Sequence, residues 1–293
     1  GGITLPIIVM NPEQHSFQQM IDYRLEPNLY SVELAGQFAR AAALNAVRDF
    51  PVHLKIDTGM NRLGLKSAEE MAAVVEVCRS QSQLRVQSVF SHLAASEDPA
   101  MDTFTLGQIS RFREMGDLAA GMLNYPVMRH ILNSAGIERF ANYQFDMVRL
   151  GIGLYGVSST GLPLKAISRL KSTLSQIKEV MPGETVGYNR AGVIERRSRI
   201  AVIPVGYADG LDRRLGNGNG MVYINGVMAP LTGNICMDMC MADVTGVACK
   251  TGDEAEFFGD RISIREVAER AGTIPYEILT GISQRVKRIY VQD

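Results

Sequence analysis

The chain has 293 residues, of which 46% are hydrophobic and 21% are charged, and its formal net charge at pH 7 is −1. This length suffices for two domains or one large barrel, and the composition is typical of a soluble globular protein. The balanced charge gives no basic footprint for a nucleic acid or a membrane surface, and no apolar run approaches the roughly 20 residues of a membrane helix. We therefore expect a cytoplasmic protein that binds neither nucleic acid nor membrane.

The four cysteines give no sign of a metal site. Cys236 and Cys240 stand four residues apart, and no histidine or second cysteine pair follows at metal-ligand spacing. We expect free thiols, as in a reducing compartment, and no bound metal.

The first half of the chain alternates between strand-like and helix-like segments. Such alternation predicts parallel βα units, and several of them fit a βα barrel whose active site lies at the carboxyl ends of its strands. A Ser at 67 three residues before Glu70 predicts a capping box at the start of one helix. The expected strands are 3–10, 29–31, 52–56, 86–92, 130–133 and 145–149, and the expected helices are 32–48, 67–79, 101–122 and 136–140.

Polar groups follow several of these strands. In the strand at 52–56, alternation places His53, Lys55 and Asp57 on one face, opposite Leu54 and Ile56. Buried Lys and Asp side chains are costly unless they pair or take part in chemistry. A single polar residue after a strand is most often structural, but a succession of them favours a site.

A second polar cluster comes from the last strands of this half. Gly151 and Gly153 follow Arg149 and leave backbone N–H groups open to an anion, and Ser134 adds a hydroxyl. Because late barrel strands are a recurrent place for a phosphate, these residues predict a phosphate cradle.

The second half has a different character, from about Ser158 onward. Short β-runs punctuated by Gly and Pro replace the helical periodicity, and Asn225-Gly226 predicts a hairpin between two of them. We therefore predict two domains, residues 1–157 and 158–293, without internal repeats. The expected strands of the second domain lie at 166–180, 200–205, 221–224, 227–231, 240–244, 254–258 and 286–291, with helices at 264–271 and 275–279.

At this point five ordered motifs resemble the alanine racemase family. Residues 55–64, KIDTGMNRLG, resemble the K-x-D-T-G-M-x-R-L-G segment of alanine racemases, and residues 146–156, DMVRLGIGLYG, resemble their V-R-x-G-I-x-x-Y-G strand. The remaining motifs are Gly187-Tyr188, residues 206–210 and Cys236-Met237-Asp238. The resemblance implies a pyridoxal 5′-phosphate (PLP) enzyme with a TIM-type (β/α)8 barrel and a β domain. It would interconvert L-alanine and D-alanine as a homodimer and supply D-alanine for peptidoglycan.

The resemblance also implies roles for residues of the first domain. Arg149 would donate to the ring nitrogen of the cofactor and keep the pyridine neutral, since an Arg does not give up its proton. The weaker electron sink favours return of a proton to Cα over side reactions. Arg62 would reach the phenolic oxygen and the substrate carboxylate, oriented by a carbamylated Lys55. His92 would lie beside the ring, and the phosphate would be held by Asn133, Ser134, Gly151 and Ile152.

In the second domain, the resemblance implies that Tyr188 from the partner subunit is an acid–base group, with Met237 and Asp238 near it. Gln284 stands where relatives often place a Tyr that helps with the phosphate, so that contact is open. Glu97 and Arg213 fall where relatives line the access corridor, and Asn234 replaces an Arg of some relatives.

One departure concerns the lysine that holds the cofactor covalently. Relatives carry it on the first barrel strand in a K-A-N-A-Y-G-type segment, which this sequence does not contain, and Lys55 lies in a different motif. We therefore expect an incomplete barrel that lacks its first two strands, and a chain that is inactive by itself.

Two alternatives remain open. The first is another reaction on the same architecture, such as broad-specificity racemisation or decarboxylation. Arg149 discriminates here, because decarboxylases of this architecture tend to place a carboxylate near the ring nitrogen. The second is a non-catalytic fragment with interaction or oligomerisation roles.

Overall fold

The computed structural model describes residues 2–80 and 83–291 and divides the chain into two compact units. Unit 1 comprises the residues up to Gly153 together with Ser158–Pro163, and unit 2 comprises Leu154–Val157 together with the residues from Leu164 onward. Each unit is described by itself below. Within the described ranges, no helix is both long enough and apolar enough to cross a membrane.

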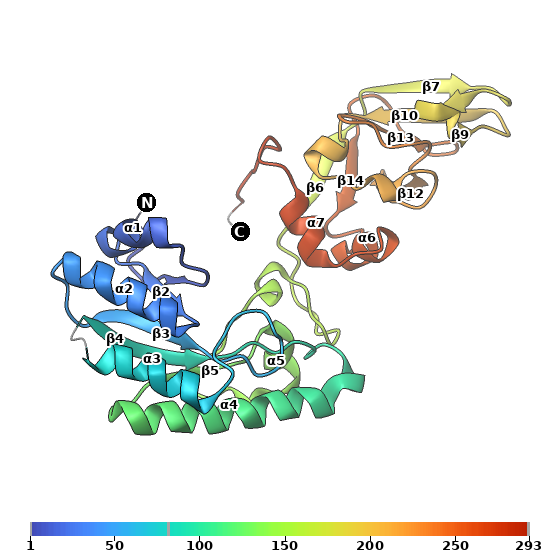
Figure 1. Cartoon of the computed structure of the whole chain (residues 1–293). Coiled ribbons are helices and arrows are strands. Elements are labelled where there is room, and N and C mark those ends of the chain that lie inside the picture. The colour runs from blue at the N-terminus through green and yellow to red at the C-terminus, as the bar shows by residue number, and fades with distance from the viewer. Residues whose placement is uncertain (1, 81–82, 292–293) are drawn as a thin grey trace. The chain divides into compact units, whose positions relative to one another are not determined.

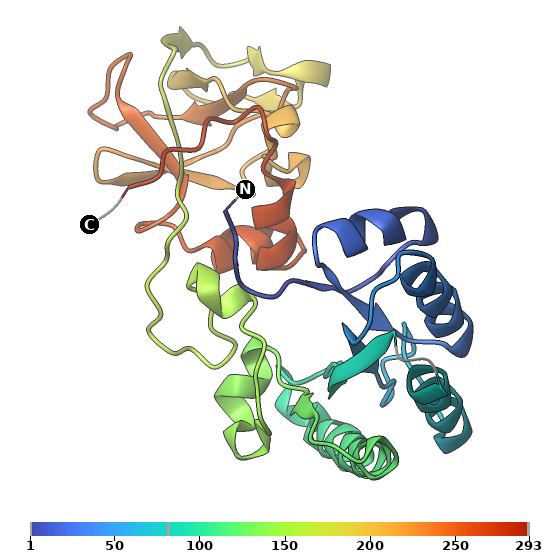
Figure 2. The same ribbon diagram turned by 90° about the vertical axis from the view of Figure 1, so that its left-hand side faces the viewer.

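Unit 1 is built on a parallel sheet with five strands in sequential order, β1-β2-β3-β4-β5. Helices alternate with the strands and lie along one face of the sheet (Figures 1 and 2). This arrangement is the expected series of βα units. The strands are Ile8–Val9, Glu26–Leu29, Phe50–Lys55, Leu84–Phe90 and Met128–His130, and the helices α1 to α5 are Phe17–Asp22, Val32–Leu44, Ala68–Ser80, Asp102–Leu123 and Ser134–Arg139.

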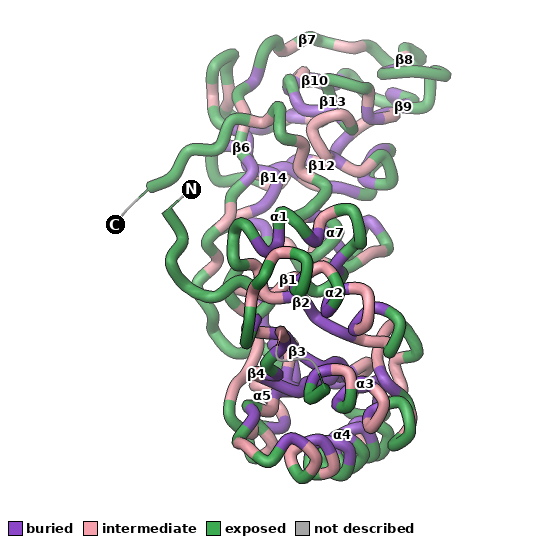
Figure 3. The backbone as a smooth tube through the Cα atoms, turned by 60° about the vertical axis from the view of Figure 1, so that its left-hand side comes forward, coloured by how far each residue is buried: buried purple, intermediate pink, exposed green. Residues whose placement is uncertain are grey.

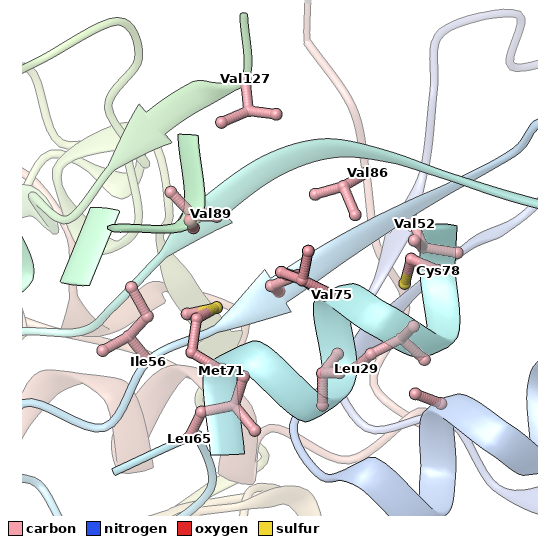
Figure 4. Close-up of a cluster of buried hydrophobic side chains, with 14 of the residues drawn as sticks. Leu29, Val52, Ile56, Leu65, Met71, Val75, Cys78, Val86, Val89 and Val127 are labelled. Carbon is pink, nitrogen blue, oxygen red and sulfur yellow. The ribbon is translucent and has the colours of Figure 1, made fainter. Parts of the chain in front are cut away.

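The core of unit 1 fills the space between the sheet and its helices. Leu29, Val52 and Val86 point from the strands toward Met71 and Val75 of α3 (Figure 4). Buried residues run along β2, β3 and β4 (Figure 3). Since each fully buried aliphatic side chain contributes roughly 1.5–3 kcal/mol, this layer fixes which face of each strand meets the helices. The face of the sheet that points away from the helices carries the alternate residues of each strand.

That opposite face is polar, and a β-bulge determines which residues reach it. Val52 pairs with Val86, but His53 pairs with Ser88, so Gln87 is an extra residue in β4. A bulge of this kind shifts the alternation of one strand by one position. As a result, Ser88 joins His53 on the polar face, although strict alternation would have put it with Val86.

Two local predictions are confirmed at the level of hydrogen bonds. The backbone N–H of Glu70 donates to the Ser67 hydroxyl at 3.2 Å, and the Ser67 N–H donates to the Glu70 carboxylate at 3.4 Å, which is the capping box of α3. At the hairpin, Asn225 and Gly226 have φ values of 43° and 93°, as a type I′ turn requires.

Two expected strands are wrong. Residues 145–149 form no strand: Phe145 has φ 54°, and the segment makes two separate backbone bonds to β5 and its continuation, from Asp146 N to Arg129 O and from Arg149 N to Leu132 O, without a ladder. Residues 286–291 also form no strand. The Arg288 guanidinium instead donates to backbone oxygens just after α7, including Ile282 O at 2.8 Å. In the first expected strand, residues 3–10, only Ile8–Val9 pairs.

Unit 2 is a β unit with two short helices. Its sheets have the orders β13-β10-β7, β12-β11-β14-β6 and β8-β9, and all of the pairs are antiparallel. The expected strand at 166–180 is two strands, β6 and β7. The strands β6 to β14 are Leu170–Thr173, Gln176–Val180, Thr185–Val186, Gly192–Val193, Ser198–Ile203, Met221–Ile224, Val227–Pro230, Cys240–Asp243 and Glu254–Phe258, and α6 and α7 are Ile264–Arg270 and Pro275–Gly281.

Gly64 lies in a segment that returns beside the end of β3, where the backbone leaves no room for a side chain. Gly64 has φ 138°, and a Cβ there would lie 2.5 Å from the backbone N of Asp57. We expect Gly64→Ala to lower the free energy of unfolding by roughly 2–4 kcal/mol, because both the backbone conformation and the space exclude a side chain. Chemical denaturation followed by circular dichroism measures this change.

Gly107→Ala is the matched control, since Gly107 lies in α4 and a Cβ there meets nothing within 4 Å. It should stabilise the helix by about 0.5–1 kcal/mol. Equal effects of the two substitutions would contradict the interpretation of Gly64.

Candidate functional site

The end of β3 combines a structural carboxylate with a buried amine. Asp57 Oδ1 accepts hydrogen bonds from the backbone N–H groups of Gly59 at 2.9 Å and Asn61 at 3.0 Å, so this carboxylate shapes the turn. The side chain of Lys55 is buried, and its Nζ lies 5.9 Å from the ring centroid of Phe90. Burial lowers the pKa of Lys55, and the Arg62 and Arg149 charges lower it further. Arg62 itself is exposed.

Arg149 is held by acceptors that carry no charge. One terminal nitrogen donates to His130 Nδ1, and the other donates to Ser91 O at 2.5 Å and Ile131 O at 3.2 Å, with His92 Nδ1 at 3.4 Å. Within residues 2–80 and 83–291, no carboxylate forms an ion pair with it. Burial lowers the pKa of Arg149 to about 10, which still leaves it positively charged near neutral pH. A local salt bridge is therefore not what fixes this side chain.

The two histidines beside Arg149 are neutral near pH 7. Burial lowers the pKa of His92 to about 4 and that of His130 to about 3, and the Arg149 charge adds to both shifts. A neutral imidazole has one nitrogen without a proton, which can accept from the guanidinium. The His130 ring also stacks on Phe90, with centroids 4.9 Å apart and planes at 3°. The arrangement therefore presents a fixed cation whose hydrogen-bond acceptors are neutral.

The residues predicted to hold a phosphate are neighbours at α5. The Ser134 hydroxyl accepts from the backbone N–H groups of Gly151 at 2.8 Å and Gly153 at 3.1 Å. The Asn133 Oδ1 accepts from the Gly136 N–H at 2.9 Å and thereby caps the helix, and Ile152 is buried. Both backbone N–H groups thus point at the Ser134 oxygen, which leaves the hydroxyl hydrogen of Ser134 as the donor not used in these two bonds.

Three of the predicted residues of unit 2 line a hollow of about 630 Å³. Tyr188, Met237 and Asp238 line it together with Lys178. Tyr188 is 69% exposed, and its backbone oxygen accepts from Asn234 Nδ2 at 3.1 Å. This phenol is therefore held from the backbone while its ring stays accessible.

A double ion pair fixes Asp238. Arg285 donates to Asp209 Oδ1 at 2.7 Å and to Asp238 Oδ1 at 2.6 Å, and these bonds raise the pKa of Arg285. Asp209 also accepts from the Gly206 N–H at 2.8 Å, so it serves as both a turn former and a partner. Gln284, Arg213 and Glu97 are exposed, and the Arg213 guanidinium lies 6.0 Å from the Tyr207 ring centroid.

Two residues that contact predicted site residues, His130 and Arg285, were not predicted from the sequence. His130 lies directly against Arg149, yet within its expected strand it carried no motif. Its place beside the other inward polar groups follows from its pairing with Phe90, which in turn pairs with Lys55, and this register is not visible in the sequence. Arg285 was adjacent to a flagged position, but its two partners are 47 and 76 residues away in the chain.

Two family models match the chain. The model described as alanine racemase, N-terminal domain, matches residues 1–159, and the model described as alanine racemase, C-terminal domain, matches residues 167–290. The matched ranges together span nearly the whole sequence.

Individual relatives agree with these models. The chain is 38% identical to the alanine racemase of Halothermothrix orenii, over 99% of this chain and 78% of the relative. It is 35% identical to alanine racemase 1 of Clostridium acetobutylicum, over 100% of this chain and 78% of the relative.

Solved structures share the fold. An alanine racemase from Streptomyces lavendulae superposes with a TM-score of 0.93 at 29% identity, covering 100% of this chain and 79% of that chain. An alanine racemase from Bartonella henselae with covalently bound pyridoxal phosphate gives a TM-score of 0.87 at 30% identity, covering 98% and 79%.

The buried histidines predict a pH dependence of stability. The pKa of His130 is about 3 in the folded chain, and near 6.5 in an unfolded one. As the pH falls below about 6.5, the unfolded state takes up a proton that the folded state refuses, so stability decreases down to the folded pKa. We expect His130→Asn to reduce the slope of unfolding free energy against pH by about 1.4 kcal/mol per pH unit between pH 6 and 4.

Denaturant titrations of the two proteins at several pH values measure this slope. The slope reports proton uptake independently of the absolute stability, so packing changes at the Asn do not obscure it. Equal slopes in both proteins would show that His130 is protonated in the folded state over this range.

Proposed function

Because the chain belongs to the alanine racemase family, whose members are PLP-dependent isomerases, we propose how its own residues serve the interconversion of L-alanine and D-alanine. The observation that carries the proposal is the Arg149 guanidinium, which is held by neutral acceptors without a carboxylate partner. Such a cation suits the ring nitrogen of a pyridine, to which it donates without transferring its proton.

The residues of unit 1 fit the cofactor. The Ser134 hydroxyl, and the N–H groups of Gly151 and Gly153 that now donate to it, would hold the phosphate together with the adjacent Asn133 and Ile152. In Asn133, Oδ1 is occupied by the Gly136 N–H and the Ser96 hydroxyl, which leaves Nδ2 as the group to donate to an anion. Bound pyridoxal phosphate would supply an electron sink that acidifies the Cα proton of alanine.

Three further side chains of unit 1 have proposed positioning roles. His92 is neutral and borders Arg149, so it would lie beside the cofactor ring without adding charge. Arg62 would hold the substrate carboxylate. The lowered pKa of Lys55 increases its neutral fraction, which is the form that reacts with carbon dioxide, so carbamylation is chemically favoured at this amine. The resulting carbamate would orient Arg62.

Proton transfer is proposed for Tyr188, acting from the partner subunit of a homodimer. Its exposed ring is available to another chain, and Met237 and Asp238 share its hollow. The phenol oxygen would hold and deliver a proton at Cα. Arg285 would keep the Asp238 carboxylate in place. A phosphate contact from Gln284 and a cytoplasmic location remain proposals from the sequence.

The covalent lysine is a separate proposal. We infer that none of the lysines of residues 1–293 is the covalent anchor, because Lys55 belongs to a different motif and the others lie outside the predicted strand ends. On this inference, residues 1–293 produced alone do not racemise alanine. The expectation of two further barrel strands likewise stays a prediction.

A decarboxylase on the same architecture is the weaker candidate function. It would favour a carboxylate at the position of Arg149, since a protonated ring nitrogen gives a stronger electron sink. The set of neutral acceptors around Arg149 argues against it.

An assay of alanine racemisation tests the function. The product of the complete reading frame, loaded with pyridoxal phosphate, should form D-alanine from L-alanine and lose the activity by at least about a hundredfold in Tyr188→Phe, which removes the proton-transferring oxygen. Chiral chromatography measures the product. Release of carbon dioxide from alanine without D-alanine would support the decarboxylase instead.

A second test addresses the cradle. Ser134→Ala removes one donor to the phosphate and leaves two backbone N–H groups without their present acceptor, so we expect the dissociation constant for pyridoxal phosphate to rise about 10- to 100-fold. Titration calorimetry measures it. Ser110→Ala, at an exposed serine of α4 that bonds only Glu114, is the control and should leave the constant unchanged. An equal constant in wild type and Ser134→Ala would exclude this serine from the phosphate site.

A further inference from the structure

A continuous chain of hydrogen bonds crosses the polar face of the sheet in unit 1. Glu26 Oε2 lies 2.7 Å from His53 Nε2, His53 Nδ1 lies 2.6 Å from Ser88 Oγ, and Ser88 Oγ lies 3.1 Å from His130 Nε2. The other nitrogen of His130 accepts from Arg149. Each of the strands β2 to β5 contributes one residue, and we call this set the Glu26 relay.

The protons of the relay have one consistent arrangement. Arg149 only donates, so His130 Nδ1 accepts and the proton of this neutral ring is on Nε2, which donates to Ser88. The Ser88 hydroxyl then donates to His53 Nδ1, and His53 Nε2–H donates to the carboxylate of Glu26. Every donor in the series faces an acceptor, from the cation at one end to the anion at the other.

The three central members of the relay are shielded from water, whereas the Glu26 side chain is partly exposed. His53 is 2% exposed, and Ser88 and His130 are 0% exposed. Burial lowers the pKa of both histidines, so neither carries charge near neutral pH. In such surroundings the dipoles of linked hydrogen bonds polarise one another, and a charge at one end is screened weakly.

We propose that Glu26, His53 and Ser88 are positioning residues that act through His130 on Arg149. The negative charge of Glu26 aligns the relay so that His130 presents an acceptor to the guanidinium and stabilises its charge. Glu26 thereby contributes to the orientation of Arg149 without touching it. The consequence for racemisation rests on the proposed role of Arg149, but the coupling along the relay does not.

The register of strands β3 and β4 determines whether the relay can form. His53 and Ser88 are direct partners in the β3–β4 ladder only because of the bulge at Gln87. Without that extra residue the Ser88 side chain would point toward the helices, and the two histidines would have no common partner. The bulge thus joins the carboxylate half of the relay to the Arg149 half.

Nuclear magnetic resonance of the imidazole nitrogens tests the coupling directly, because the chain has only four histidines. In protein labelled with ¹⁵N at histidine, we expect Glu26→Gln to shift the signals of His53 and also of His130, which does not contact Glu26. The signals of His15, an exposed histidine beside Glu13 that takes no part in the relay, should stay in place. In a Ser88→Ala background, Glu26→Gln should no longer move His130.

Glu33→Gln is the matched control, since Glu33 bonds only the exposed Gln37 on α2; it should move none of these signals. Glu26→Asp retains the charge at a shorter reach and should give a smaller shift than Glu26→Gln, which keeps the test usable if the latter folds poorly. The proposal is overturned if His130 is unmoved by both Glu26 substitutions, or if it moves equally with and without Ser88.

A kinetic measurement addresses the consequence for the reaction. In the product of the complete reading frame, Glu26→Gln should lower kcat for alanine racemisation by about two- to thirtyfold with KM unchanged. A change in KM alone would contradict a role through Arg149. If the wild type does not racemise alanine, the proposed function fails, whereas the imidazole signals still decide the relay.

Discussion

The charge of Arg149 is held by hydrogen-bond acceptors that carry no charge. A buried cation normally lies beside a carboxylate, since desolvation of a lone charge is expensive. Here the guanidinium is satisfied by backbone oxygens and by neutral imidazole nitrogens instead. The cost is visible in the lowered pKa of Arg149 and of both neighbouring histidines. A site of this kind keeps its positive charge available to a ligand rather than neutralised by the protein.

This constraint explains the composition of the sheet's two faces. The helix-facing side is aliphatic and supplies the stability of unit 1. On the other side, hydrogen bonds offset the desolvation cost of the buried polar groups. Glu26 bonds with His53, and His130 bonds with Ser88 and Arg149. Among the buried side-chain atoms of the described residues, Asn28 Oδ1 and Thr105 Oγ1 lack a partner. Asn28 pairs with His53 and therefore lies on this polar face, although its oxygen is buried.

Much of this organisation was predictable from the sequence, because it depends on local signals. Alternation gave the orientations of His53 and Lys55, the Ser67–Glu70 spacing gave the start of α3, and Asn225-Gly226 gave the hairpin. The bulge at Gln87 was not predictable, since a bulge is defined by the neighbouring strand's register. Strand alternation alone would have assigned Ser88 to the aliphatic layer. The error at 145–149 has a similar origin: its β-like sequence lacks a complete ladder to join.

Arg285 in unit 2 was equally hard to predict, because its partners lie 47 and 76 residues away in the chain. Its contacts with Asp209 and Asp238 bring together two motifs that each looked complete in the sequence. Since an exposed single ion pair is worth little, the orienting effect must come from the fork that holds both carboxylates at once. Asp238 is thereby fixed on the rim of the hollow that contains Tyr188. In each unit, then, a remote side chain fixes a charged group of the proposed site: His130 for Arg149, and Arg285 for Asp238.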